Sequence, residues 1–522
     1  MCQNHDSPDE CPIPSARPAP AMQIPGRQRN RGTLPTQPVI LKSVFVIDGT
    51  GAPPYGPADI LLREGRVAAI VDKSDPIAKG LYGEIDLPAA HQDAEVIDLP
   101  GHFVMPGLVD SHAHIGNRQQ APDADYVYRL WLAHGVTTVR EVGCLNGLDF
   151  SLSESERSAQ HEITAPRIVP YPFFGTEHPG PITDARTAAQ WVQNVADRGA
   201  RGVKFMGAAP AAFEAALKET TTLGMDSACH HEQRRVRQIN ALTTARWGLR
   251  SIEHWYGLPE AMFRDRTVQD FAPDYNYSDE PARYASGGPL WMQSAEPGSA
   301  AWDETLDEFL SLGVTLSPTF NIYIGHRDAA RVRNSEWHTE FTAPQLWNFF
   351  EPDPESHGSV YGDWGIEQEA PWRQAYVRWM RFTLDYKNRG GRVTAGSDSG
   401  FIYKTYGFGM VEELELLREA GFHPLDIVRA ATLDTAHLIG MDTEIGSVEV
   451  GKNADLIVLD ENPLSNLKVM YGHGALRYTD EGPQRHSAIK YTIKGGSVFD
   501  SAQLRDDVRA IVAEEKHRLG AR

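Results

Sequence analysis

Residues 107–116, GLVDSHAHIG, place His112 and His114 one residue apart at the end of an apolar run, HFVMPGLVD. Such a run is typical of a buried strand. On a strand, residues i and i+2 face the same side, so both imidazoles would point to one place. An isolated H-x-H is typical of two partly exposed loop histidines. Residues elsewhere in the chain decide whether His112 and His114 are such loop histidines or parts of one functional site.

The H-x-H run is the first of eight short apolar runs, and helical segments with glycine at their ends lie between them. Alternation of strand and helix predicts an α/β fold with a parallel sheet, and eight units fit a closed (β/α)8 TIM barrel over residues 105–444. The eight runs are GLVDSHAH, VTTVREVG, RIVPYPFF, GVKFMG, GMDSACHH, RSIEHW, VTLSPTF and RVTAGSD.

The two ends of the folded chain have a β pattern. Early strands such as VILKSVFV and late strands such as IKYTIK predict a small β-sandwich domain built from residues 37–104 and 445–500. HPLDIVRAATLDTAHLIG predicts one amphipathic helix before the late strands, and residues 501–522 predict a charged C-terminal helix. The polar, proline-rich residues 1–36 are interpreted as a disordered arm.

Two connections, residues 255–312 and 321–391, are far longer than barrel loops usually are. Both follow predicted barrel strands and are rich in Trp, Tyr and Pro. They therefore predict long insertions at the mouth of the barrel, either as a helical elaboration or as a lid that shapes a substrate pocket.

Composition limits the partners of this chain. Its 522 residues carry a formal net charge of −20, which repels phosphate backbones and argues against nucleic acid as a partner. The four cysteines form no C-x-x-C pair, and no apolar run is long enough to cross a membrane. We expect a cytoplasmic protein that acts on a small molecule, with an export signal upstream of Met1 as the alternative. Homo-oligomerisation is left open.

Titratable residues recur at the ends of the predicted strands, where barrel enzymes have their active sites. Imidazoles and carboxylates are the usual ligands of Zn²⁺ and similar ions, and a metal offsets the cost of burying them together. Taken singly, His254 is typical of a core histidine and Asp398 of a turn or an N-cap. The joint pattern predicts a metal site made of His112, His114, Lys204, His230 or His231, His254 and Asp398.

Lys204 differs from the other members of this set because an ammonium group repels a metal ion. Val203 and Phe205 flank it, which indicates burial rather than a solvated lysine. Burial and nearby positive charge lower the pKa of a lysine, and the neutral amine can add CO₂. The resulting carbamate can bridge two metals. A neutral lysine that donates a hydrogen bond is the alternative.

These motifs resemble those of the amidohydrolase superfamily. The resemblance rests on MPGLVDSHAH, GVTTVREVG, GVKFM, RSIEH, TAGSDSG and the late GKNADLIVLD, and it is strongest to the imidazolonepropionase-like and prolidase-like branch. It implies two divalent metal ions, with Zn²⁺ the expected ion. His112, His114 and Asp398 would hold the more buried ion, and His230 and His254 the other. Lys204 would be the bridging carboxylated lysine. The strand-five run departs from the family pattern, and His231 is the alternative to His230.

The predicted function is hydrolysis of a C–N bond of the amide type. A hydroxide shared by two metals would attack the carbonyl, with Asp398 as proton shuttle. A dipeptide or N-acyl amino acid is the expected substrate. A lactone or cyclic-amide hydrolase, a mononuclear deaminase and a non-catalytic scaffold are the alternatives, the scaffold being the weakest. The candidate substrate contacts are His178, Tyr256, Tyr323, Arg327 and Tyr403.

Overall fold

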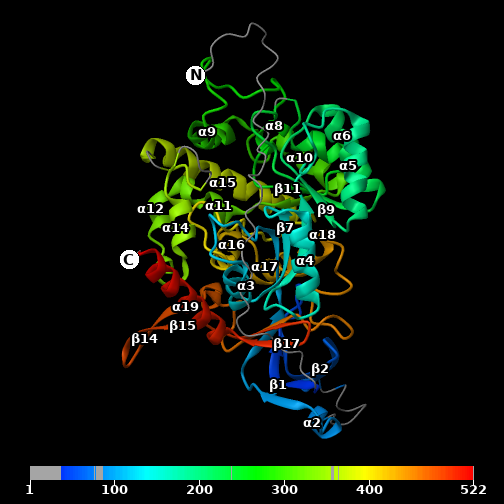
Figure 1. Cartoon of the computed structure of the whole chain (residues 1–522), viewed down its shortest axis with the longest axis vertical. Coiled ribbons are helices and arrows are strands. Elements are labelled where there is room, and N and C mark those ends of the chain that lie inside the picture. Colours follow the sequence, from blue (N-terminus) through cyan, green and yellow to red (C-terminus); the bar gives the residue numbers. More distant parts are fainter. Residues whose placement is uncertain are drawn as a thin grey trace.

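The structure is a computed structural model of the chain, and it describes residues 37–75, 77, 86–236, 238–353, 358–361 and 364–520. The predicted disordered arm, residues 1–36, lies outside the described residues. The fold is mixed α/β (Figure 1). Helices surround parallel strands in the middle of the molecule, and a sheet containing β1, β2 and β17 lies at the lower end of the view.

The lower sheet combines strands from both ends of the described chain. Its order is β17-β16-β13-β5-β1-β2-β3, and β4 also pairs with β1. Late strand β13 inserts between late strand β16 and early strand β5, antiparallel to both. The strands are β1 (Val39–Val46), β2 (Tyr55–Arg63), β3 (Arg66–Asp72), β4 (Glu95–Asp98), β5 (Phe103–Pro106), β13 (Leu456–Leu459), β16 (Ile489–Lys494) and β17 (Ser497–Asp500).

Alternation along these strands gives the sheet two covered faces. Val39 and Leu41 pack in one core cluster with Leu456 and other late residues. Ile40 points to the opposite face and packs with Leu87 of the short helix α2 (Leu87–Ala90). The two terminal segments thus share one sheet and one core. The predicted sandwich, which requires two packed sheets, stays a prediction, as do the domain limits.

Seven of the eight predicted barrel runs form parallel strands. They make two ladders, β6-β7-β8 and β9-β10-β11-β12. A parallel bridge between Phe173 and Lys204 connects the two ladders. The strands are β6 (Leu108–Ala113), β7 (Val136–Gly143), β8 (Arg167–Pro172), β9 (Gly202–Phe205), β10 (Asp226–Cys229), β11 (Ser251–Glu253) and β12 (Thr315–Ser317).

The eighth run, RVTAGSD, lies between the free edges of these ladders. Val393 forms a parallel bridge with Leu316 of β12, and the Ser111 amide of β6 donates to the Ala395 carbonyl at 3.0 Å. The segment is too short to count as a strand, yet it hydrogen-bonds on both sides.

Helices separate successive strands as the alternation predicts. Asp123 and Asp184 cap α3 and α5 by accepting hydrogen bonds from backbone amides two or three residues into the helix. The helices that precede a strand are α3 (Ala124–Ala133), α4 (Leu148–Ala159), α5 (Ala185–Asp197), α6 (Pro210–Thr222), α7 (Ala241–Arg246), α10 (Ala300–Leu312) and α15 (Ile366–Asn388), the last of which precedes the RVTAGSD segment.

The two long connections are helical. Helices α10 and α15 each lead straight into the next barrel run, so they belong to the alternation rather than to the mouth. The additional helices are α8 (Leu258–Ala261), α9 (Glu280–Gln293), α11 (Phe320–Arg327), α12 (Ala329–Arg333), α13 (His338–Phe341) and α14 (Pro344–Phe350). Helix α9 packs along α15 and α11 packs against α15. Buried tryptophans fill these contacts, and the Trp372 indole donates to the Tyr284 carbonyl at 2.8 Å.

After the barrel runs, α16 (Phe408–Glu419) is followed by two short helices where the sequence predicts one. These are α17 (Pro424–Ala430) and α18 (Leu433–Leu438). The break occurs because the carbonyls of Ala430 and Ala431 accept hydrogen bonds from Ala395 and Val109 instead of continuing the helix. Tertiary pairing therefore overrides helix propensity here.

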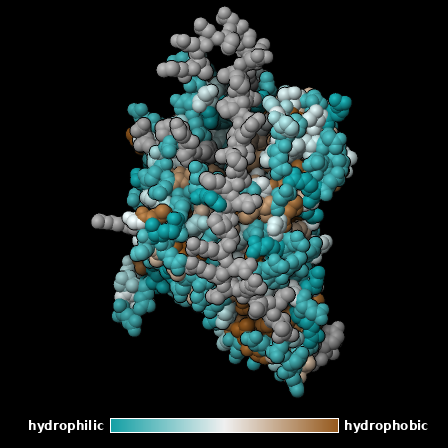
Figure 2. Space-filling view, in the orientation of Figure 1, coloured by the Kyte–Doolittle hydropathy of each residue, from teal (hydrophilic) through white to brown (hydrophobic). Residues whose placement is uncertain are grey.

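The chain ends in a short 3-10 turn η1 (Leu467–Met470), a hairpin of β14 (Ala475–Thr479) and β15 (Gly482–His486), and α19 (Ser501–Leu519). Asp500 caps α19, and the helix packs against α3. Polar side chains dominate the visible surface (Figure 2). Among the described helices, none is long and apolar enough to cross a membrane.

Candidate metal centre

Buried polar side chains converge at the ends of the parallel strands. His112 lies on β6, and His114 follows its last residue. The His114 Nε2 atom lies 3.1 Å from Asp398 Oδ1, and the His254 Nε2 atom lies 3.7 Å from Asp398 Oδ2. The rings of His112 and His254 are 4.7 Å apart. Ligand atoms of His112, His254 and Asp398 all lie within 4.8 Å of one another.

Lys204 and His230 extend this cluster. The Lys204 Nζ atom on β9 lies 3.2 Å from His112 Nε2, and its side chain is buried. His230 directly follows the last residue of β10, and the centroid of its ring lies 4.8 Å from that of the His254 ring. The neighbouring His231 faces away, with its Nε2 atom 2.7 Å from Thr244 Oγ1 of α7. Adjacent residues on a strand face opposite sides, so only His230 joins the cluster.

A buried chain of charges supports His112 from behind. Its Nδ1–H donates to Glu253 Oε2 at 2.6 Å. Arg140 on β7 donates to Glu253 Oε1 and to Asp226 Oδ2, both at 3.0 Å, and stacks on Tyr171. Burial raises the pKa of the Glu253 carboxyl, but Arg140 and then Lys204 hold it below its ordinary value. Glu253 therefore remains anionic and fixes the orientation of the His112 ring.

Three residues of the cluster adopt left-handed backbone conformations that non-glycine residues rarely take. His254, Thr319 and Asp398 have φ values of +64°, +50° and +47°. The turn at His254 breaks the strand alternation, so Glu253 and His254 both reach the interior. Before Asp398, Gly396 allows close approach, because a Cβ there would lie 2.8 Å from the His112 Cβ. Strained backbone of this kind is characteristic of functional sites.

Hydrogen bonds assign the protonated nitrogen of two imidazoles. Thr319 Oγ1 donates to the Pro318 carbonyl at 2.6 Å, so it accepts from His254 Nδ1–H at 2.6 Å. His112 Nδ1–H donates to Glu253. Burial first, and then nearby positive groups, hold the pKa of both rings well below the usual range. Both Nε2 atoms therefore carry lone pairs.

These lone pairs and the Asp398 carboxylate are acceptors that face one another. The His114 Nδ1 atom is also buried without a hydrogen-bond partner in the described part of the chain. Converging acceptors in a buried site require a cation, and neutral imidazoles with a carboxylate are the donor set that divalent metals such as Zn²⁺ prefer. The residues present fit a metal ion.

Two of the predicted substrate contacts border the cluster. The Tyr256 ring stacks on the His230 ring with centroids 4.2 Å apart. Its hydroxyl lies 3.1 Å from the hydroxyl of Tyr323, whose ring is 5.5 Å from the His254 ring. At another member of the cluster, Phe401 packs edge-on against His114. Aromatic side chains thus flank the candidate ligands.

The structure places the other three predicted contacts among different partners. Arg327 forms a bidentate ion pair with Glu419, at 2.7 and 2.8 Å, and lies over the Tyr376 ring. His178 Nδ1 hydrogen-bonds the Gly180 carbonyl in its own loop at 2.6 Å. Tyr403 packs against rings of the α14 segment.

Sequence reasoning missed the residues behind the ligands: Arg140, Asp226, Glu253 and Thr319. The sequence does contain a sign of two of these residues, because Arg140 and Glu253 are charged residues inside predicted strand runs, VTTVREVG and RSIEHW. A charge inside such a run is seldom buried without a partner.

Comparisons with known proteins give a family match over part of the chain. The amidohydrolase family model matches residues 380–496, which include Asp398. A segment of 92 residues is 42% identical to imidazolonepropionase of Shouchella clausii and covers 18% of this chain and 19% of that protein. A segment of 103 residues is 36% identical to adenine deaminase 2 of Rhizobium etli, covering 18% and 17%. The chain thus spans less than a fifth of the length of these curated relatives.

Among solved structures, a Xaa-Pro dipeptidase with bound methionine in its active site aligns over 89% of this chain and 100% of its own, with 18% identity and a TM-score of 0.58. The match of residues 380–496 to the amidohydrolase family supports the superfamily that the sequence motifs resemble. In this structure, the predicted strand-end residues lie together. At 18% identity, the similarity to the dipeptidase shows a shared fold and nothing about activity.

Glu253 provides a first test of the centre. We expect Glu253→Gln to weaken metal binding about 10- to 100-fold, because the His112 ring loses its anionic hydrogen-bond acceptor. Chelator competition with the purified protein measures this change. Glu154→Gln is the matched control, since Glu154 is also buried and accepts a hydrogen bond, from Tyr128 Oη, but belongs to outer helix α4. Equal metal affinity in both variants would show that Glu253 does not support the metal centre.

Proposed function

We propose that this protein is a metal-dependent enzyme that hydrolyses a C–N bond of the amide type. One observation carries the proposal: neutral imidazoles of His112 and His254 and the carboxylate of Asp398 direct acceptors at one buried point. Such a point suits a divalent cation. The match to the amidohydrolase family supports the same conclusion.

We also propose that the eight runs close into a (β/α)8 barrel. The bridge at Phe173 and Lys204, the bridge at Leu316 and Val393, and the Ser111–Ala395 hydrogen bond support closure. In such a barrel all strand ends open to one mouth, where the active sites of this fold lie.

The proposed centre holds two divalent ions, with Zn²⁺ the expected ion. His112, His114 and Asp398 would bind one and His230 and His254 the other. A divalent metal supplies Lewis acidity, which polarises a carbonyl and makes water more acidic. Burial lowers the pKa of Lys204 from 10.5 to about 8, so a substantial neutral fraction exists near neutral pH. The neutral amine adds CO₂ with loss of a proton, and the carbamate would supply oxygens to both ions.

Residues of the protein would transfer the proton, orient the imidazoles and contact the substrate. Asp398 accepts a proton from the attacking water at its carboxylate and returns it to the leaving nitrogen. Glu253 and Thr319 hold the imidazoles of His112 and His254 in one tautomer and orientation. The Tyr256 and Tyr323 hydroxyls lie beside the cluster, where they can donate to a substrate oxygen.

The proposed substrate is a dipeptide or an N-acyl amino acid. The aromatic rings at the cluster, Tyr256 beside His230 and Phe401 beside His114, suit the apolar groups of such a substrate. The carboxylate of such a substrate needs a cationic partner. Arg327 already binds Glu419, so it can serve only if that ion pair opens.

Deamination is the second candidate, because a segment of the chain is similar to adenine deaminase 2 of Rhizobium etli. Both reactions cleave a C–N bond, but they release different products. Ammonia from adenine would indicate deamination, and a primary or secondary amine from an amide would indicate the first proposal.

The test combines metal analysis with a substrate screen on the full chain. We expect about two divalent ions per chain and amine release from dipeptides or N-acyl amino acids. Chelation should abolish turnover, and Zn²⁺ should restore it. Less than about one bound ion per chain after metal loading would overturn the metal-dependent proposal. Ammonia release from adenine without amide cleavage would select the second candidate.

A further inference from the structure

A cavity lined by several arginines lies away from the metal centre, between α13, the β14–β15 hairpin and α19. We name it the α19 cavity. Its volume is about 330 Å³, and its lining includes Trp337, His473, Arg485, Arg505 and Arg509. This volume is enough for a small metabolite. A cluster of arginines is unusual in a chain with a net charge of −20.

Two of these arginines have carboxylate partners, and the third has none. Arg485 pairs with Glu336, and Arg509 Nε donates to Glu340 at 2.8 Å. For Arg505, the hydrogen bond that the structure gives is a long one, 3.4 Å from Nη1 to the Ile489 carbonyl. No carboxylate within ion-pair distance of Arg505 occurs in the described part of the chain. Burial, and then the charge of Arg509, lower the pKa of Arg505. Asp500, Asp506 and Asp460 act on it only from beyond ion-pair distance, so the guanidinium is partly desolvated without a carboxylate in direct contact.

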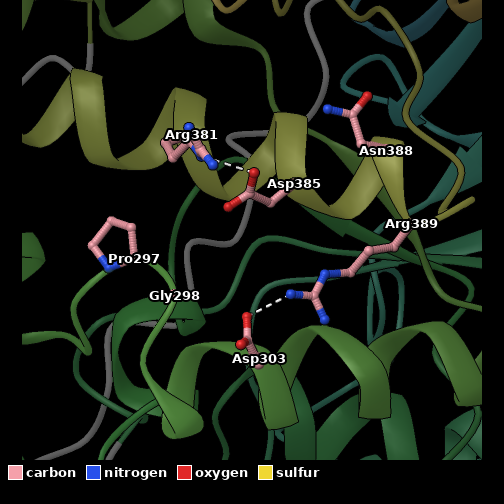
Figure 3. Close-up of a pocket in the computed structure, with 7 residues that line it drawn as sticks. All are labelled: Pro297, Gly298, Asp303, Arg381, Asp385, Asn388 and Arg389. Atoms are coloured by element: carbon pink, nitrogen blue, oxygen red, sulfur yellow. Dashed lines mark hydrogen bonds and ion pairs between the residues drawn. The ribbon is translucent and has the colours of Figure 1, made fainter.

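Another hollow, which serves as a comparison, pairs its arginines with carboxylates of its own lining, and we call it the self-neutralised hollow (Figure 3). There, between α10 and α15, Arg381 pairs with Asp385 at 2.8 Å, and Arg389 pairs with Asp303 at 2.5 Å. Each guanidinium in that hollow is matched by a carboxylate within it. The α19 cavity lacks this balance at Arg505.

The lining of the α19 cavity also includes residues with unmatched polar atoms. Trp337 Nε1, His473 Nδ1 and Ser487 Oγ are buried, and no partner for them occurs within the described ranges. An indole N–H can only donate, and a hydroxyl or a neutral imidazole N–H can donate as well. Together with Arg505, these groups offer donors in excess of acceptors.

We propose that the α19 cavity is a binding site for a small organic oxyanion, whose carboxylate or phosphate contacts the Arg505 guanidinium. A guanidinium binds either oxyanion through paired, charge-assisted hydrogen bonds. Trp337 and Phe341 provide an apolar wall for the body of the ligand. The site uses none of the residues of the metal centre, so its occupancy is independent of the proposed hydrolysis.

The test measures binding of sodium phosphate and sodium benzoate to the full-length, metal-loaded protein by calorimetry, at constant ionic strength in chloride. We expect saturable binding of at least one, and the preferred probe identifies a phosphate or a carboxylate ligand. Arg505→Gln should weaken this binding by at least about tenfold, since a hydrogen bond to a charged group is lost. Arg381→Gln, in the self-neutralised hollow, should bind like the wild type.

Two further measurements separate a binding role from a structural one. Arg505→Gln removes a half-buried charge that has no carboxylate in direct contact, so the melting temperature of the free protein should not fall. Ser487→Ala removes one hydroxyl and should weaken binding several-fold without unfolding the protein. Absence of saturable binding by either probe would overturn the proposal. Equal affinity in the wild type, Arg505→Gln and Ser487→Ala would also overturn it, because the anion would then bind elsewhere, for example at the metal centre.

Discussion

Asp398→Asn is expected to lower turnover of the metal-loaded enzyme by about 10²- to 10⁴-fold, the range for loss of a general acid–base group. The substitution keeps the size of the side chain but removes the negative charge between His114 and His254. Initial rates on the substrate found in the screen measure this effect. Asp434→Asn is the control, because Asp434 pairs with Arg429 away from the cluster.

Metal content must be measured on the same Asp398→Asn sample, because Asp398 is both a proposed ligand and the proposed proton carrier. If metal is retained, turnover should still fall by about 10²- to 10⁴-fold, because the amide cannot carry the proton. If metal is lost, turnover should stay low even after metal loading. Turnover within about threefold of the wild type, with full metal content, would exclude both roles of Asp398.

Lys204→Ala is expected to abolish turnover and to reduce metal content by about one ion per chain or more, because the variant lacks the amine that would carry the carbamate. Small carboxylic acids such as acetate or propionate should restore part of the activity by taking the place of the missing oxygens. Lys494→Ala is a close control, since burial lowers the pKa of Lys494 to about 8 as well, but its amine bonds Ser158. Unchanged turnover in Lys204→Ala would exclude the two-ion centre.

Lys204 also predicts a pH dependence of assembly. Its folded-state pKa lies near 8, below the ordinary 10.5, so the reactive neutral amine increases as pH rises towards 8 and dominates above it. Reactivation of the metal-free enzyme by bicarbonate and Zn²⁺ should therefore accelerate from pH 6.5 to about pH 8 and then level off. A rate independent of pH over this interval would argue against carboxylation.

The strands, and the grouping of the candidate ligands at their ends, could be predicted because each depends on local pattern. Runs such as RIVPYPFF are largely apolar over a strand's length, and titratable residues recur at the ends of several runs. The choice between His230 and His231 needed the structure, since a local pattern does not say which face of β10 is inward. The segment RVTAGSD was predicted only in part. It lies where the eighth strand was predicted, but it forms a bridge and single hydrogen bonds rather than a strand.

Partners that lie far apart in the chain could not be predicted. Arg327 is an unpaired cation in the sequence, and its pairing with Glu419 joins residues 92 positions apart. Arg140 and Glu253 likewise find each other across the interior, 113 positions apart. The break between α17 and α18 has the same origin, because a distant strand takes the carbonyls that the helix would use. Such choices follow from packing, not from local propensity.

The lower sheet has a consequence for how the chain is synthesised. Strand β5 ends at Pro106, and its neighbour β13 begins at Leu456, roughly 350 residues later. At the usual pace of translation this interval lasts on the order of tens of seconds. Throughout it, β5 presents unpaired backbone groups that can bind another nascent chain or a chaperone. The time of greatest aggregation risk for this protein therefore lies within its own synthesis, and it ends when β13 closes the sheet.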